Sequence, residues 1–218
     1  AQGDYERALG LYDRELCSVN SETYIDVSNQ AALLKRLQMG GMDVGDRWKV
    51  LAEHSATRIH DHMLPFRDAH FSLALAANGD FDVARQHIDS MAEFAGQAQG
   101  WRAQATRNIL LPLCEGMIAY EEGSYDRACD LLWGVRNEVV SIGGSNAQRD
   151  LFAQIICDAA VRAHRLPVAR SLLSERVQSR HSKKGNWQTY AEVLAELGET
   201  DRAEAARKQA ASAPEAGA

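Results

Sequence analysis

One short phrase recurs along this chain, and it constrains the possible fold more than any other feature of the sequence. The phrase reads Gly3-Asp4-Tyr5-Glu6-Arg7-Ala8, then Gly79-Asp80-Phe81-Asp82-Val83-Ala84, then Gly123-Ser124-Tyr125-Asp126-Arg127-Ala128, with looser copies ending at Ala169 and Ala203. From Ala84 onward the alanines are 44, 41 and 34 residues apart, and the longer gap before Ala84 leaves room for one further copy near Gly45. Repeats of this length indicate a stack of similar structural units.

The residues of the phrase predict a tight turn between two helices. Glycine can end a helix in the left-handed conformation, and Asp or Ser can cap the helix that follows. Apolar residues recur at helical spacing on both sides of the turn. They predict helices over 66–78, 109–122, 149–164 and 187–197 before the turns, and over 82–94 and 126–140 after them.

Helix, short turn and helix at this repeat length is the tetratricopeptide pattern. We therefore expect an all-α protein, a right-handed α-solenoid of tetratricopeptide-like helical hairpins over residues 1–210. Residues 211–218 are rich in Ala, Pro and Gly, and we expect a disordered tail there. The chain opens inside a repeat and without Met, so we expect it to be the C-terminal part of a longer array.

Composition narrows the classes of partner. The net charge of -6 provides no general attraction to phosphate backbones or anionic membranes, so we expect neither nucleic acid nor a membrane as a partner. The cysteines Cys17, Cys114, Cys129 and Cys157 are widely spaced within apolar stretches, which favours buried free thiols in the reducing cytoplasm. Trp48, Trp101, Trp133 and Trp187 occur about once per repeat, and we interpret them as packing between helices.

Three segments carry a resemblance to a known family. Ile142-Gly143-Gly144-Ser145-Asn146-Ala147-Gln148-Arg149-Asp150-Leu151-Phe152 resembles a stretch typical of the tetratricopeptide repeat protein 38 family. Leu33 to Leu37 with Val44 to Trp48, and Phe66 to Phe71 followed by Leu73 to Leu75, are similar to other parts of it, in the same order. The similarity runs over about residues 20 to 200. It implies a helical-repeat fold in a C-terminal half, and no established reaction or ligand.

Histidines are the first candidates for chemistry. His54, His60, His62 and His70 fall within a short stretch, but His60 and His62 are two residues apart and would point to different sides of a helix. We therefore expect no metal site and no cofactor. Asp68 suits the first turn of the helix that begins near Phe66, and His70 shares a stripe with Phe66 and Leu73. These two residues are either a cap and a packed side chain, or polar anchors in a ligand groove.

A polar cluster follows the Gly143-Gly144 turn. It contains Asn146, Arg149 and Asp150, and Ser145 or Asn146 can cap the next helix. These residues either hold one repeat against the next or contact a ligand. The expected concave face adds an apolar floor of Leu113, Met117 and Tyr120, with a polar end of Gln154, Asp158 and Arg162.

The sequence favours a protein that binds rather than catalyses. No Ser or Cys lies in a setting typical of a nucleophile, and we expect no catalytic residue. Our first hypothesis is a scaffold that holds a protein, a peptide or a small molecule in the concave groove, with a homo-oligomer possible. The alternative is an enzyme, or half of one, that uses His70 with Asp68 or Asp150 for acid–base chemistry. A self-assembling structural module is the third.

Overall fold

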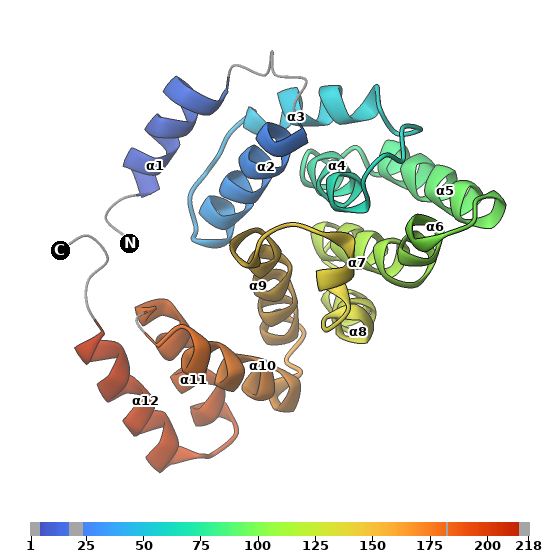
Figure 1. Cartoon of the computed structure of the whole chain (residues 1–218). Helices are drawn as coiled ribbons and strands as arrows, with labels where there is room; N and C mark the ends of the chain where they lie inside the picture. Colours follow the sequence, from blue (N-terminus) through green and yellow to red (C-terminus); the bar gives the residue numbers. More distant parts are fainter. Residues whose placement is uncertain (1–4, 18–23, 182, 214–218) are drawn as a thin grey trace. The chain divides into compact units, whose positions relative to one another are not determined.

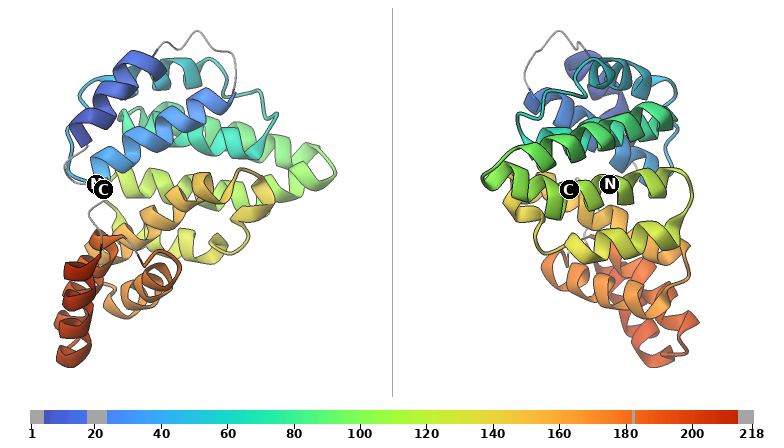
Figure 2. Two further views of the ribbon diagram at one scale, coloured as in Figure 1. Left: turned by 60° about the vertical axis from the view of Figure 1, so that its left-hand side comes forward. Right: turned by 90° about the vertical axis from the view of Figure 1, so that its right-hand side faces the viewer.

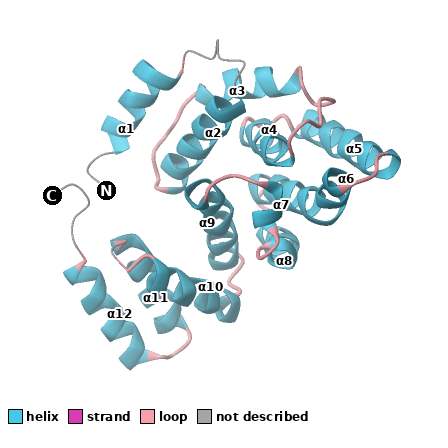
Figure 3. Cartoon of the chain, viewed as in Figure 1, coloured by secondary structure: helices cyan, strands magenta, loops and turns pink. Residues whose placement is uncertain are grey.

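A computed structural model describes residues 5–17, 24–181 and 183–213, and every regular element in these ranges is helical (Figure 3). The all-α prediction is confirmed. Contacts between Cα atoms divide the chain into two compact units, residues 2–155 and residues 156–218. Helix α9 crosses this boundary, and each unit is considered by itself below. None of the described helices is long and apolar enough to cross a membrane.

The first unit is built from helices joined by short turns. Its elements are α1 (Tyr5–Leu11), a π-helical turn (Tyr12–Leu16), α2 (Tyr24–Met39), α3 (Arg47–Ala56), α4 (Pro65–Ala77), α5 (Phe81–Gln97), α6 (Trp101–Ala105), a second π-helical turn (Thr106–Leu110), α7 (Leu111–Glu121), α8 (Tyr125–Val135), a 3-10 turn (Val139–Ile142) and the start of α9 (Asn146–Arg162). The second unit holds the rest of α9, α10 (Leu166–Ser179), α11 (Lys184–Glu196) and α12 (Thr200–Ser212).

Helix α4 is the centre of the first unit (Figures 1 and 2). It packs against α2, α3, α5 and α7, and α7 in turn packs against α5 and α8. Every residue from Pro65 to Ala76 is buried, because neighbouring helices cover α4 on all sides. In the second unit α11 packs against both α10 and α12. Within each unit, helices that are close in sequence are therefore close in space.

The same backbone closure ends five helices. In each, an amide donates to the carbonyl five residues earlier, at 2.8 to 3.0 Å: Met42 to Leu37, Asp80 to Leu75, Ser124 to Ala119, Arg165 to Ala160 and Glu199 to Leu194. The residue before each donor has a positive φ; it is glycine in four cases and His164 in the fifth. This closure satisfies carbonyls at the helix end. The left-handed turn glycines predicted from the phrase are confirmed at Gly79, Gly123 and Gly198.

The two residues predicted to cap the helices that follow the turns do not do so. Asp80 and Ser124 precede the next helices, but neither side chain makes a capping hydrogen bond. Oδ2 of Asp80 instead accepts a 2.8 Å hydrogen bond from the side-chain Nδ2 of Asn78. The alanines behave as predicted, because Ala84 and Ala128 are fully buried at the helix contacts.

Some boundary and packing predictions need correction. Helix α12 continues through Ser212, so residues 211 and 212 belong to a helix; residues 214–218 lie outside the described residues. Cys17 is exposed, whereas the other three cysteines are buried, and all four are free thiols. Trp48 is buried as expected, but Trp101 and Trp133 are exposed.

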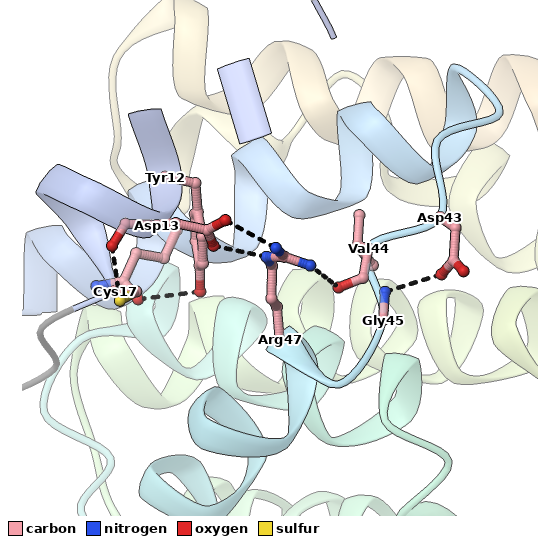
Figure 4. A network of polar contacts seen from close by, with 8 residues as sticks. Tyr12, Asp13, Cys17, Asp43, Val44, Gly45 and Arg47 are labelled. Atoms are coloured by element: carbon pink, nitrogen blue, oxygen red, sulfur yellow. Dashed lines mark hydrogen bonds and ion pairs between the residues drawn. The ribbon is translucent and has the colours of Figure 1, made fainter. Parts of the chain in front are cut away.

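A polar network ties the turn after α1 to the start of α3 (Figure 4). The Nε and Nη2 atoms of Arg47 donate to the two carboxylate oxygens of Asp13, both at 2.7 Å, and Nη1 donates to the Val44 carbonyl at 2.9 Å. The hydrogen bond from Arg47 lowers the pKa of Asp13. Both side chains are partly exposed to solvent, so we expect the pair to fix geometry and to contribute little to stability.

The His164 turn gives a first prediction. His164 holds φ of 51°, where the other four turns have glycine. A non-glycine residue in this region costs about 1–2 kcal/mol, which the greater entropy loss of glycine on folding partly offsets. We therefore expect His164→Gly to raise the free energy of unfolding of the second unit by about 0.5 kcal/mol. The mirror substitution Gly123→Ala should lower the stability of the first unit by about 1 kcal/mol. Urea titrations followed by circular dichroism measure both, and equal signs for the two changes would contradict this account.

Candidate functional site

Helix α4 carries Asp68 and His70, predicted to be either a cap and a packed side chain or polar anchors for a ligand, and both lie in the interior. Asp68 is 2% exposed and His70 is 0% exposed. No hydrogen bond joins them within the described part of the chain. The helix that bears them is surrounded by α2, α3, α5 and α7, which explains why they do not face a groove.

His70 is a packed side chain. Its Nδ1 donates to the Phe66 carbonyl at 2.8 Å, since a carbonyl can only accept, and this assigns the proton to Nδ1. The ring lies against Phe66 and Phe152, with centroids 4.5 and 5.4 Å away. Burial lowers the pKa of His70 to about 4, so the imidazole is neutral at physiological pH. These contacts match the packing interpretation of His70.

Asp68 occupies the first turn of α4 as expected, but its carboxylate is not solvated. Burial raises the pKa of Asp68 to about 7, while the neighbouring Arg67 guanidinium acts in the opposite direction. Oδ1 of Asp68 finds no hydrogen-bond partner among the described residues. A buried carboxylate oxygen without a donor is uncommon in folded proteins, and it identifies this place as one to examine for chemistry.

The expected apolar floor of a groove is also interior. Leu113, Met117 and Tyr120 all lie on α7 and are buried, because α7 packs between α4, α5 and α8. Tyr120 contacts Tyr125 edge to face and lies under the ammonium group of Lys35. In this arrangement the three side chains present no surface to a ligand, so they form core and not groove.

A buried ion pair lies beside this floor. Lys35 on α2 and Glu121 on α7 are joined by a contact of 2.6 Å between Nζ and Oε1, with side chains only 4% and 9% exposed. Nζ of Lys35 also contacts the side-chain oxygen of Gln38 at 3.2 Å. The pair connects two helices distant in sequence.

The polar residues around α9 make local contacts. Arg149 donates to the carbonyls of Gly143 and Gly144 and to Oδ1 of Asn146, so it holds the glycine turn closed. Gln154 donates to Asp150 at 2.7 Å. In the second unit Arg162 donates to Asp158 at 2.5 Å. Asn146 therefore contacts Arg149. Gln154 pairs with Asp150, and Arg162 pairs with Asp158, each about one helical turn away on partly exposed surface.

Ser145, and not Asn146, caps α9. The Ser145 hydroxyl accepts from the amide of Gln148 at 3.3 Å, and the Ser145 amide donates to Oε1 of Gln148 at 2.8 Å. These reciprocal bonds form a capping box. The first part of α9 is further attached to α2, since Arg36 donates to the Ala147 carbonyl at 2.8 Å.

The structure also gathers residues that sequence reasoning did not place together. His62, Asp68 and His87 each offer one ligand atom, and these atoms all lie within 4.8 Å of one another. Neither the spacing of the histidines nor any motif indicated His87 as a functional residue. A signal was present, because Ala84, His87 and Met91 form one buried stripe of α5 in which only His87 is polar.

No protein-family model matches the chain, and no solved structure matches it.

Proposed function

We propose that this chain is part of a tetratricopeptide-type α-solenoid that binds a protein or peptide partner and does not itself catalyse a reaction. The recurring turn supports this, since five helices end in the same closure. The packing within each unit supports it too, because consecutive helices lie against one another. The resemblance to the tetratricopeptide repeat protein 38 family fits a longer array, and the free thiols fit a location in the reducing cytoplasm. Solenoids present extended surfaces that suit the binding of partners.

The observation that carries this proposal is a group of exposed apolar side chains in two segments of the first unit that a hydrogen bond joins. Met63 and Trp101 are each 59% exposed, and Leu64 is also exposed. Met63 and Leu64 precede α4, and Trp101 begins α6. Arg102 joins the two segments, because its Nη1 donates to the Met63 carbonyl at 3.4 Å. Trp, Met and Arg are enriched where proteins bind each other.

This surface replaces the apolar floor first expected of a groove. Leu113, Met117 and Tyr120 contribute to the core, so the partner would gain its apolar contact from Met63, Leu64 and Trp101 instead. The polar residues Asn146, Arg149, Asp150 and Gln154 are on partly exposed surface, and we retain them as candidate contacts for the orientation of the partner.

The alternative of an acid–base enzyme has less support. His70 is fully buried and neutral, and its Nδ1 is committed to a backbone carbonyl. A general base has to reach the proton it removes, directly or through one water molecule. No hydrogen bond between His70 and either Asp68 or Asp150 is present in the described residues.

Substitution of Trp101 tests the scaffold proposal. A tryptophan at the centre of an interface often contributes 2 kcal/mol or more, so we expect Trp101→Ala to weaken partner binding by about 30-fold. Proteins captured by the full chain would be identified by mass spectrometry, and the affinity of a purified partner would then be measured for each variant. Trp133→Ala is the matched control, since Trp133 is also exposed and stacks under Arg136. Equal affinities for the two variants would contradict a docking role for Trp101.

Oligomeric state is measured on the same variants. Size-exclusion chromatography with light scattering shows whether the partner is a second copy of the chain. In that case Trp101→Ala should convert the oligomer to a monomer, and Trp133→Ala should not.

A further inference from the structure

His62, Asp68 and His87 gather beside α4 and α5, and each offers one ligand atom within 4.8 Å of the others. Each also holds one buried side-chain atom without a hydrogen-bond partner among the described residues: Nδ1 of His62, Oδ1 of Asp68 and Nε2 of His87. Asp68 and His87 are essentially fully buried, and His62 is half-buried. A buried polar atom without a partner destabilises the fold, so three in one place constitute a strong local penalty. Something other than a described protein group is needed to satisfy them.

Each ligand candidate is delivered by a different element. Asp68 comes from the first turn of α4, and His87 from the buried stripe of α5. His62 lies in the turn that precedes α4, with φ of 45°. Non-glycine residues in this left-handed region are uncommon and often lie at functional sites. The His62 ring stacks against His87 and Phe94, with ring centroids 6.2 and 5.3 Å away.

One nitrogen of each imidazole ring, in His62 and in His87, already makes a hydrogen bond with a serine hydroxyl. Nε2 of His62 lies 2.9 Å from the Ser90 hydroxyl, and Nδ1 of His87 lies 3.1 Å from the Ser72 hydroxyl. If each hydroxyl accepts a hydrogen bond from the ring N–H, the remaining nitrogens, Nδ1 of His62 and Nε2 of His87, carry no proton. Each can then donate a lone pair to a metal ion. The Ser90 hydroxyl can then donate to Nδ1 of His60, which is 2.7 Å away. Metal-binding histidines are typically oriented in this way by a second hydrogen bond.

We propose that His62, Asp68 and His87 bind one divalent transition-metal ion of the zinc class. Two imidazole nitrogens and one carboxylate oxygen suit zinc and its neighbours, and do not suit Mg²⁺ or Ca²⁺. Bonds of about 2.0–2.1 Å in a tetrahedral site place ligand atoms about 3.4 Å apart. The three atoms would therefore close by at most about 1.4 Å from their 4.8 Å limit.

The local charges are compatible with a cation. Burial lowers the pKa of His87 to about 3, and burial also lowers that of His62, so both rings are neutral ligands at physiological pH. Arg67 is the positive group nearest to Asp68 in sequence. Its Nη2 lies 3.3 Å from Oδ2 of Asp61, so a second carboxylate balances its charge.

Metal titration of the purified full chain tests the proposal. The chain is first stripped with a chelator, and ZnCl₂ is then added in a calorimeter. We expect one equivalent to bind. Asp68→Asn and His87→Gln should each weaken binding at least 100-fold, whereas MgCl₂ should give no binding. With CoCl₂ we expect visible absorption bands of a low-coordinate site, present in the unsubstituted chain and absent from both variants.

Two controls separate a built site from surface histidines. His54→Gln changes a half-buried ring that lies outside the cluster, and His181→Gln changes an exposed one. Both should bind zinc as the unsubstituted chain does. Ser72→Ala keeps all three ligands and removes the hydrogen bond to His87, together with the one between Ser72 and Cys114, so it should weaken binding by about 10–100-fold. This variant keeps the test decisive if Asp68→Asn does not fold.

Two results would overturn the proposal. Failure of the unsubstituted chain to bind zinc would mean that the three atoms enclose only water. Equal binding by the unsubstituted chain, Asp68→Asn, His87→Gln and Ser72→Ala would mean that zinc binds elsewhere. Because neither result concerns the exposed surface around Trp101, this test is independent of the proposed scaffold function.

Discussion

Replacing Lys35 with methionine should lower the free energy of unfolding of the first unit by about 3–5 kcal/mol. The substitution leaves the Glu121 carboxylate at a position where its side chain is only 9% exposed, without the ammonium group 2.6 Å away. A buried carboxylate loses its hydration, and in the variant the attraction of the Lys35 ammonium group no longer offsets that cost. The loss should appear as a lower midpoint in urea titrations followed by circular dichroism.

The double substitution Lys35→Met with Glu121→Leu should recover most of that loss. Buried ion pairs replaced by apolar side chains of similar volume are often neutral or stabilising. We therefore expect the double variant to unfold within about 1 kcal/mol of the unsubstituted chain. Lys49→Met is the matched control, since Lys49 is exposed on α3 in the same unit, and it should change stability by less than about 0.5 kcal/mol. A single variant as stable as this control would show that the buried pair contributes little.

Replacing Gly144 with alanine should be the second large effect. Gly144 has φ of 76°, and a Cβ atom added there would lie 2.4 Å from a ring carbon of Phe66. Phe66 is buried and packs against His70 and Phe152, so its ring has little room to move. Backbone strain of about 1–2 kcal/mol and overpacking of about 1–3 kcal/mol predict a total loss of about 2–5 kcal/mol.

Gly143→Ala separates the cost of backbone strain from the cost of overpacking. Gly143 also has a positive φ, at 100°, but an added Cβ would meet nothing closer than Phe66 Cβ at 3.8 Å. We expect this variant to show the backbone cost alone. Adding Phe66→Leu to Gly144→Ala should restore part of the stability, because the shorter side chain withdraws the clashing ring atoms. Identical midpoints for Gly143→Ala and Gly144→Ala would rule out the close approach as the cause.

Sequence reasoning succeeded where the determining contacts are local. Gly79, Gly123 and Gly198 predicted the turns because the closure joins residues only five positions apart, and the positive φ it needs favours glycine. The same locality explains the error at Asp80 and Ser124. Their chemistry permits capping, but the backbone closure occupies the turn, and the Asp80 side chain bonds to Asn78 instead.

Sequence reasoning failed to predict which faces of a helix other helices cover. Met117 and Tyr120 were expected on a groove because their spacing places them on a common stripe, whereas His70 was predicted either as a packed side chain or as a groove anchor. The stripe exists, but a stripe is covered or open depending on which helices pack over it. Helices α4 and α7 are enclosed by neighbours, and nothing within either segment specifies those neighbours.

The amino-acid sequence by itself determined that the chain is helical and where most helices turn, since those features depend on residues within a few positions of one another. Tertiary structure decided which polar groups meet. Lys35 and Glu121 are 86 positions apart, and His62 and His87 are 25 apart. Their encounters depend on the packing of α2, α4, α5 and α7, because only packing brings side chains of separate helices within bonding distance.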